Sequence, residues 1–340
     1  MIRILKREPL SLAAATLGIT RTLEFLARRP CLLALNYHRV GDPGADGYDP
    51  ALVEATAAEF DAQVGLLKKR FHMVGLAEAQ DLAADPSRLR HTHVLITFDD
   101  GYRDNHDVAL PILRSHGVRA AFFLATGFVG TNRIPWWDQV GLMLRKTRAA
   151  SIRLTYPRSV SWDLAAVPRE RVIREVLRLY KHRDTEDADR FLNELEAACE
   201  VKRPHEAAER LFMTWDEARA LRDAGMGIGS HTHRHELLAK LSPEEQMEEC
   251  RRSREIIREQ LGITVDALAY PVGSRESFSE VTLRCLREAG YRTAFSYYGG
   301  VNVPPAVATL DVARIPVDRS SLPLYRLRVG LAAVTGRQVW

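Results

Sequence analysis

The stretch at residues 94–101, VLITFDDG, decides the fold class of this chain. An unbroken apolar run is typical of a strand buried on both faces of a parallel sheet, and this run ends in two carboxylates and a glycine. Barrel enzymes place catalytic residues at the carboxyl-terminal ends of such strands. Asp99 and Asp100 would stand there, and they can take different roles because neighbouring residues on an extended chain point in different directions. An ordinary Asp-Gly turn is the alternative interpretation.

Apolar runs of the same kind recur along the chain, separated by helix signals. The unit that begins at Thr214 shows the pattern: a capping box (TWDE), a helix, a stop at Gly225 and a short apolar run that ends at Ser230. Further apolar runs lie at 32–37, 119–124, 263–269, 291–295 and 312–317. Helices that alternate with buried strands predict an α/β fold, here an irregular (β/α) barrel of about seven parallel strands; the alternative is an open doubly wound sheet.

Residues 133–210 break this rhythm. They contain two charged, helix-like stretches, 169–182 and 188–201, and no clear buried strand. We therefore expect one catalytic barrel over residues 31–320, with 133–210 as a helical insertion.

The two ends of the chain are mildly amphipathic. Residues 1–30 predict an N-terminal amphipathic helical segment, and residues 321–340 a C-terminal tail in which the stretch 324–334 is similar in character. Packing against the fold is the preferred interpretation, and peripheral contact with a membrane surface is the alternative. The apolar part of the first segment is short and is followed by arginines, so an amphipathic helix is preferred to the alternative of a weak signal peptide. The expected location is the cytoplasm or the periphery of the inner membrane.

Composition excludes several classes of protein. The 340 residues are 46% hydrophobic and 27% charged, which excludes a disordered chain, and no apolar run reaches the roughly 18 residues of a spanning helix. The net charge is only +4, because 48 basic residues nearly balance 44 acidic ones. The sequence has no basic stripe interleaved with aromatic residues, so nucleic-acid binding is not predicted. Four scattered cysteines fit neither a CxxC site nor a disulfide framework and suit a reducing compartment: Cys31, Cys199, Cys250 and Cys285.

A dense histidine cluster, GSHTHRH at residues 229–235, follows another of the predicted strands. His231 and His235, at positions i and i+4, can meet one metal ion if the segment turns helically. Neutral imidazole is the commonest transition-metal ligand, and a carboxylate completes a three-ligand site that leaves positions for water. His233 is expected to point away from the other two.

Together, TFDDG at 97–101 and HTHRH at 231–235 resemble the polysaccharide deacetylases of the NodB-homology family (carbohydrate esterase family 4). LNYHRV at 35–40 resembles the YHxV element of the family's exopolysaccharide deacetylase branch, and AYPVG at 269–273 resembles that branch's AYPYG element. The resemblance covers residues from about 32 to 318, is weakest over the insertion, and implies the same irregular (β/α) barrel.

The resemblance implies a role for each matching residue. Asp100, His231 and His235 would hold a divalent metal, usually zinc, although cobalt, nickel or manganese occur in the family. Asp99 would be the general base toward the attacking water, whose pKa the metal lowers. The metal would hold the oxyanion together with the backbone N–H of Val272. Val272 follows the proline of the AYPVG element, which is the family's third motif.

The chain departs from the family pattern at two positions. Most members carry an Arg two residues before that proline, which orients the catalytic Asp; here the position is Ala269, so Arg314 is the candidate substitute and Arg103 the second. Most members also carry a C-terminal Leu-x-His that protonates the leaving amine, whereas this chain has no His after His235. In the exopolysaccharide branch the acid His lies upstream, which corresponds to His38 here; a core histidine is the alternative.

Two aromatic residues complete the predicted site. Trp137 would stack on a sugar ring or anchor the insertion by packing, and Tyr270 would contact the substrate. The predicted function is a metal-dependent hydrolase that removes N-acetyl groups from amino sugars of a polysaccharide, an oligosaccharide or a lipid-linked glycan. The alternatives are hydrolysis of another small amide and a non-catalytic glycan-binding protein with a degenerate site. An acetylated glycan is the expected partner.

Overall fold

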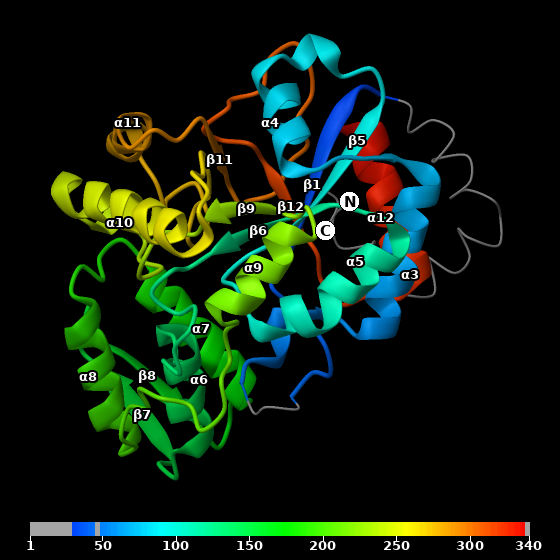
Figure 1. Ribbon diagram of the computed structural model, residues 1–340. Helices are drawn as coiled ribbons and strands as arrows, with labels where there is room; N and C mark the ends of the chain where they lie inside the picture. Colours follow the sequence, from blue (N-terminus) through cyan, green and yellow to red (C-terminus); the bar gives the residue numbers. More distant parts are fainter. Residues whose placement is uncertain (1–28, 45–47, 337–340) are drawn as a thin grey trace. The chain divides into compact units, whose positions relative to one another are not determined.

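The computed structural model describes residues 29–44 and 48–336, whose contacts define two compact units (Figure 1). The first unit contains the described residues up to 43, residues 51–130 and those from 212 onward. The second contains residues 44–50 and 131–211. The predicted segment at residues 1–30 lies almost wholly outside the described residues.

The first unit is built on a parallel sheet that curls into a nearly closed (β/α) barrel, as the sequence predicts. Seven strands follow one another in the order β11-β10-β9-β6-β5-β1-β12. An additional short strand, β4, pairs with the N-terminal part of β5. A parallel bridge between Phe295 and Val312 brings the two ends of the sheet together. The strands are β1 (Cys31–Tyr37), β4 (His72–Met73), β5 (Thr92–Phe98), β6 (Ala120–Leu124), β9 (Gly227–Ser230), β10 (Ala267–Ala269), β11 (Thr293–Phe295) and β12 (Arg314–Pro316).

Helices cover the outer face of this sheet, where their apolar residues join the outward-facing strand residues in one core. The predicted capping box at Thr214 is present and another lies at Ser242, and a side-chain cap of this kind stabilises a helix by about 1 kcal/mol. The helices on this face are α3 (Ala57–Arg70), α5 (Leu110–His116), α9 (Trp215–Asp223), α10 (Pro243–Leu261), α11 (Glu280–Glu288) and α12 (Leu322–Thr335). Helix α4 (Leu76–Ala84) packs instead on inward-facing strand residues. Shorter elements are β2 (Arg39–Val40), β3 (Val53–Ala55), the 3-10 turns η1 (Pro50–Leu52), η2 (Pro86–Arg88) and η4 (Leu238–Lys240), and the π-helical turn η3 (Asn105–Ala109).

The interior of the barrel is apolar at one end and polar at the other. Alternate residues of the strands form a second, smaller core together with α4; the strand members are Leu32, Ala34, Leu95, Ala121, Phe123, Ala267, Ala269 and Phe295. Because side chains alternate along a strand, the same inward row continues from Ala34 to Asn36 and from Leu95 to Thr97 and Asp99. The carboxyl-terminal end of the barrel therefore carries a buried polar layer above the apolar one.

The second unit contains three helices and a two-stranded antiparallel hairpin. The predicted insertion at 133–210 lies within this unit. Its elements are α6 (Trp136–Lys146), β7 (Ser151–Leu154), β8 (Val160–Asp163), α7 (Arg169–Lys181) and α8 (Ala188–Cys199). Two of the helices coincide with the predicted helix-like stretches, whereas α6 and the hairpin were not predicted.

Residues 322–335, in the stretch predicted as a tail, form helix α12. Its apolar side chains are buried against the first unit, as the packing interpretation expects. Among the described residues, no helix is long and apolar enough to cross a membrane.

Candidate active site

The two acidic residues after β5 diverge because the backbone turns left-handed between them. Asp99 continues the inward row of β5, while Asp100 has φ +72° and Gly101 has φ +85°. A Cβ on Gly101 would lie 3.1 Å from Leu124 Cδ2, so a side chain there would be crowded as well as strained. The turn thus separates two carboxylates that are adjacent in sequence, and both are buried.

Asp100, His231 and His235 come together as a candidate metal-binding group. The Nε2 atoms of both histidines lie 3.3 Å from Asp100 Oδ1. All three side chains are buried, and Asp100 Oδ1 has no hydrogen bond of normal geometry within the described part of the chain.

The hydrogen bond on the far side of His231 shows that this group fits a divalent cation. His231 Nδ1 lies 2.8 Å from Ala269 O, and because a carbonyl oxygen only accepts, Nδ1 carries the proton. In its neutral form the ring then directs the lone pair of Nε2 at an anionic oxygen, which is unfavourable unless a cation lies between them. Zinc and related metals prefer this donor set of two imidazoles and one carboxylate.

The protonation states of two members of this group also suit a metal. Burial opposes the ionisation of Asp100, but its contacts with His231 and His235 outweigh that effect and hold the pKa of its carboxyl well below the usual range. Burial lowers the pKa of His235, which favours the neutral, metal-binding form of its ring.

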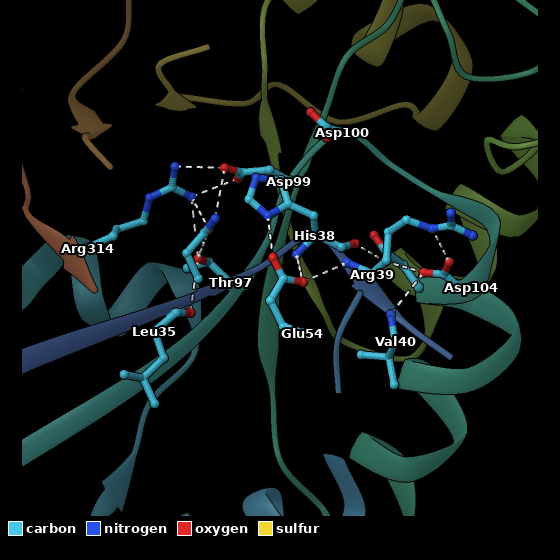
Figure 2. A network of polar contacts seen from close by, with 12 residues as sticks. Leu35, His38, Arg39, Val40, Glu54, Thr97, Asp99, Asp100, Asp104 and Arg314 are labelled. Atoms are coloured by element: carbon cyan, nitrogen blue, oxygen red, sulfur yellow. Dashed lines mark hydrogen bonds and ion pairs between the residues drawn. The ribbon is translucent and has the colours of Figure 1, made fainter. Parts of the chain in front are cut away.

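Asp99 is held by Arg314, which reaches it from β12 on the far side of β1 (Figure 2). Arg314 Nη1 donates to Asp99 Oδ1 at 2.7 Å and Nη2 donates to Oδ2 at 2.8 Å, so the pair is bidentate. Burial opposes the ionisation of Asp99, but the charge of Arg314 outweighs it and lowers the pKa of the carboxyl. Of the two arginines that the sequence left open, Arg314 contacts Asp99, whereas Arg103 pairs with Asp107.

Two further residues of the polar layer fix this pair. Asn36 Nδ2 donates to Asp99 Oδ2 at 3.2 Å, and Asn36 Oδ1 accepts from Thr97 Oγ1 at 2.6 Å and from Arg314 Nη1. Arg314 Nε donates to Ser296 O at 3.0 Å. The guanidinium and the carboxylate are therefore held on several sides by neighbours that are themselves buried.

His38 lies at the end of β1 and pairs with Glu54 of β3 (Figure 2). Its Nδ1 donates to Glu54 Oε1 at 2.8 Å, and Glu54 Oε2 accepts from the backbone N–H groups of His38 and Arg39 at 2.9 and 3.1 Å. Burial would lower the pKa of His38, but Glu54, with smaller contributions from Asp100 and Asp99, raises it to about 9. His38 is therefore an imidazolium at neutral pH, and its Nε2–H is a proton donor.

A second ion pair adjoins this one. Arg39 Nε donates to Asp104 Oδ2 at 2.8 Å, and the Arg39 guanidinium lies 4.9 Å from the centre of the Tyr102 ring. Burial nevertheless raises the pKa of Asp104 to about 6. The two pairs share the backbone of residues 38–40, because Asp104 Oδ1 also accepts from the N–H of Val40.

The AYPVG segment forms a tight turn beside Tyr297. Val272 has φ +64°, and Gly273 donates its N–H to Pro271 O at 2.7 Å. A Cβ on Gly273 would lie 2.6 Å from Tyr297 Cβ, so this glycine permits the close approach. The Tyr297 ring lies edge-on to His38, with 5.4 Å between ring centres.

Two predicted substrate-contacting residues are buried. Tyr270 donates its hydroxyl to Leu310 O at 2.7 Å and stacks on Phe278, so its side chain is used for packing. Trp137 is 7% exposed within the second unit and packs edge-on against Trp136. This burial favours the packing interpretation of Trp137 over sugar stacking.

Other histidines lie outside the candidate metal group. His233 points away from it, as expected, and its Nδ1 lies 3.0 Å from Thr126 Oγ1. A second group of potential ligands, His106, Asp107 and Glu217, is partly exposed. There Asp107 pairs with Arg103, and Glu217 closes the capping box on Thr214.

Sequence reasoning missed Glu54, Asn36, Thr97 and Tyr297 as parts of this site. The alternation of side chains along β1 and β5 is the signal that could have placed Asn36 and Thr97 beside Asp99. Glu54 and Tyr297 carried no such signal, because both reach the site through pairings between segments far apart in sequence or irregular in structure.

The site's geometry agrees with comparisons to known proteins. The model of the polysaccharide deacetylase family matches residues 87–294. Among curated proteins, "Putative polysaccharide deacetylase YxkH" of Bacillus subtilis (strain 168) is 22% identical over 236 residues, which cover 69% of this chain and 51% of YxkH. The chain thus spans about half the length of this curated relative.

Solved structures share the fold. The Streptococcus pyogenes deacetylase PplD, solved in complex with acetate, has a TM-score of 0.58 at 17% identity, covering 87% of this chain and 96% of PplD. IcaB from Ammonifex degensii has a TM-score of 0.55 at 19% identity, covering 90% of this chain and 98% of IcaB. Because the family match covers more than half of the chain, the chain belongs to the polysaccharide deacetylase family.

Proposed function

We propose that this protein is a metal-dependent N-deacetylase that removes acetyl groups from amino sugars of a glycan. The observation that carries the proposal is the arrangement at one end of the barrel: Asp100, His231 and His235 converge on one point, and Asp99 beside them is ionised but left out of that group. A glycan-binding protein would not need a second buried carboxylate held ionised next to a metal site.

Asp100, His231 and His235 would hold the cation, which fits their donor set; zinc is the first candidate, and cobalt, nickel and manganese are the others. A divalent cation there supplies Lewis acidity, which acidifies water and polarises an acetamide carbonyl. His231 is oriented for this by its hydrogen bond to Ala269 O.

Asp99 is the general base in this proposal. Its Oδ2 accepts from Asn36 and Arg314, while its Oδ1 accepts only from Arg314 among the described residues, so Oδ1 can accept one more proton donor. Arg314 keeps the carboxylate ionised and fixes its orientation. This arrangement prepares one oxygen of Asp99 to take the proton of the attacking water.

His38 is the general acid in this proposal. Glu54 accepts a hydrogen bond from the Nδ1–H of the imidazolium. The Nε2 proton is therefore left for the leaving amine of the sugar. The backbone N–H of Val272, in the tight turn beside Tyr297, would donate to the oxyanion of the acetyl carbon. Tyr270 would act by holding this turn rather than by touching the sugar, since its hydroxyl is bound to Leu310.

The substrate class is an acetylated amino sugar within a polysaccharide, an oligosaccharide or a lipid-linked glycan. Support comes from the family and from the fold shared with IcaB and with PplD, whose structure contains acetate. We also propose that the protein works in the cytoplasm or at the periphery of the inner membrane, where contact of the chain with the lipid surface is the alternative to packing of its ends against the fold. Failure of the full chain to pellet with anionic liposomes at low salt would contradict that contact.

The test is acetate release from N-acetylglucosamine oligomers by the zinc-loaded protein, the chelated protein and Asp99→Asn. Acetate production that requires both zinc and Asp99 supports the proposal. If zinc binds stoichiometrically but no sugar yields acetate, the enzyme acts on another small amide and the substrate class is wrong.

A further inference from the structure

The turn that carries the two histidine ligands has a strained backbone. Thr232 has φ +63° and His235 has φ +58°, and a β-branched residue such as Thr rarely adopts this left-handed conformation. The strain has a geometric purpose, because the turn brings the rings of His231 and His235 to 4.7 Å from each other, centre to centre, with both Nε2 atoms on Asp100. Such a turn needs contacts elsewhere to hold it.

Glu249 of helix α10 supplies the strongest of these contacts. One of its oxygens, Oε2, accepts from the backbone N–H of His233 at 3.0 Å and from that of Arg234 at 2.8 Å. The other oxygen, Oε1, accepts from Arg234 Nε at 2.6 Å. Glu249 is 1% exposed, so this carboxylate is buried with both oxygens directed at the turn, and hydrogen bonds to a charged acceptor are the stronger kind.

Ser253, one helical turn after Glu249, supports the beginning of the same segment. Its hydroxyl lies 2.8 Å from that of Ser230, and Ser230 Oγ accepts from the N–H of Thr232 at 3.1 Å. Residues at i and i+4 share one helix face, so α10 presents both supports to the turn. Glu249, Ser253 and Ser230 are all buried.

The opposite side of the turn is anchored to the segment after β6. Gly127 N–H donates to His233 O at 2.7 Å, and Thr126 N–H donates to Thr232 O at 3.2 Å. A Cβ on Gly127 would lie 2.6 Å from His233 O, so this contact depends on glycine. The third histidine of the cluster therefore belongs to the anchoring of the turn, not to the ligand set.

We propose that Glu249 is a positioning residue for the metal site: it holds the strained turn in the conformation that aims His231 and His235 at Asp100. This inference rests on the proposed metal dependence. Glu249 contributes no ligand, so its loss leaves all three donors in place but lets the turn relax toward ordinary backbone angles. The expected consequence is weaker metal binding by a protein that is still folded.

The test compares Glu249→Gln with Glu248→Gln, a matched change of the exposed neighbouring residue on the same helix. The Gln amide keeps the size of the side chain but loses its charge and turns a donor toward either Arg234 Nε or the backbone N–H groups. Metal-free proteins are titrated with zinc against a chromophoric chelator, and circular dichroism checks that they are folded. The visible spectrum of cobalt-loaded protein reports ligand geometry independently of activity.

We expect the zinc Kd of Glu249→Gln to rise about 10- to 100-fold, with a changed cobalt spectrum, and that of Glu248→Gln to stay at the wild-type value. Zinc binding by a folded Glu249→Gln within twofold of wild type overturns the inference and leaves the proposed function intact. If the wild-type protein itself binds no zinc, the proposed metal dependence fails and the inference falls with it. If Glu249→Gln does not fold, Glu249→Asp decides in the same assay, because it keeps the charge but is too short to reach both N–H groups.

Discussion

Arg314 and Asp99 form a bidentate ion pair across 215 positions of sequence, with both side chains buried at the carboxyl-terminal end of the barrel. The arginine comes from β12, the last strand of the sheet, and lies beside β1, whose Asn36 contacts both partners. In the family pattern the corresponding arginine precedes the proline of the third motif, where this chain has Ala269. The same physical task, a fixed cation on the proposed base, is thus performed from a different strand.

Replacing Arg314 by lysine should lower kcat by about 10- to 100-fold while zinc still binds, because an ammonium makes one contact where the guanidinium makes two. Arg314→Met should lower the free energy of unfolding by about 3–5 kcal/mol, since it leaves a buried carboxylate unpaired. Arg292→Lys is the control, because the Arg292 side chain of the Arg292–Asp266 pair is largely exposed and such a pair is worth under about 1 kcal/mol. Steady-state kinetics and chemical denaturation measure the two effects. Wild-type kcat in a folded Arg314→Lys would remove Arg314 from the mechanism.

Glu54→Gln should shift the alkaline limb of the pH–rate profile to lower pH. His38 has a pKa raised to about 9, so an acid role is available below that pH and is lost above it. The variant removes the largest favourable influence on the imidazolium, and the groups that remain near it are Asp99, Asp100 and any cation bound to Asp100, which opposes protonation. The profile of kcat/KM between pH 6 and 10 is the measurement, with the exposed Glu78→Gln as control.

The same pair predicts how stability depends on pH. Because the pKa of His38 is higher in the folded protein than the usual 6.5, its contribution to the free energy of unfolding is complete below about pH 6.5 and disappears as the pH rises through about 9. Metal-free wild type should therefore lose stability over that interval, and Glu54→Gln should lose less. Equal pH dependence of the two proteins in urea denaturation would contradict the assigned role of Glu54.

Much of the barrel could be predicted from sequence, because each long strand is an apolar run and helices such as α9 and α10 have both a capping box and a glycine at or next to the C-cap. The shortest elements could not: β4 has only two residues, and the run at 263–269 contributes only Ala267–Ala269 to the sheet. Two residues before Ala267, Ile263 and Val265, pack on the core from a loop, which accounts for their apolar character. Apolar character predicts that a segment is buried. To form a strand, the segment also needs an adjacent strand in register with which its backbone can form hydrogen bonds.

The residues of the candidate site also divide into those that the sequence predicts and those that it does not. Asp99, Asp100, His231 and His235 stand at strand ends within short motifs, so their convergence follows from the topology of a parallel barrel. Glu54 lies in a three-residue strand that pairs with a two-residue one through an irregular register, and no local pattern marks either. The alternation rule predicts that Asn36 faces inward, but only the pairing of β1 with both β5 and β12 shows that it contacts Asp99 and Arg314.

Removal of the metal should lower thermal stability as well as activity. A ligand at about 100 times its Kd stabilises the folded state by about 2.7 kcal/mol, so chelation should lower the Tm by a few degrees. Asp100→Asn should abolish most of this difference, because it removes the one negative charge among the three donors. His106→Ala, in the partly exposed second group, should leave it unchanged. A Tm difference that survives in Asp100→Asn but vanishes in His106→Ala would place the metal at the second group.

Trp137→Ala separates packing from sugar stacking. The ring is 7% exposed and packs on Trp136, which in turn stacks on Tyr180 at 4.3 Å between ring centres. Truncating a buried aromatic side chain of this kind costs about 3–5 kcal/mol, so the second unit should unfold at a lower temperature or denaturant concentration. At a temperature where the variant is folded, KM for acetylated oligomers should stay within about twofold of wild type, since a packing residue makes no contact with substrate.

Trp162, 7% exposed in the same unit, gives a matched control, because its truncation should destabilise similarly. A tenfold rise in KM with unchanged stability, seen for Trp137 and not for Trp162, would return Trp137 to the substrate-binding surface.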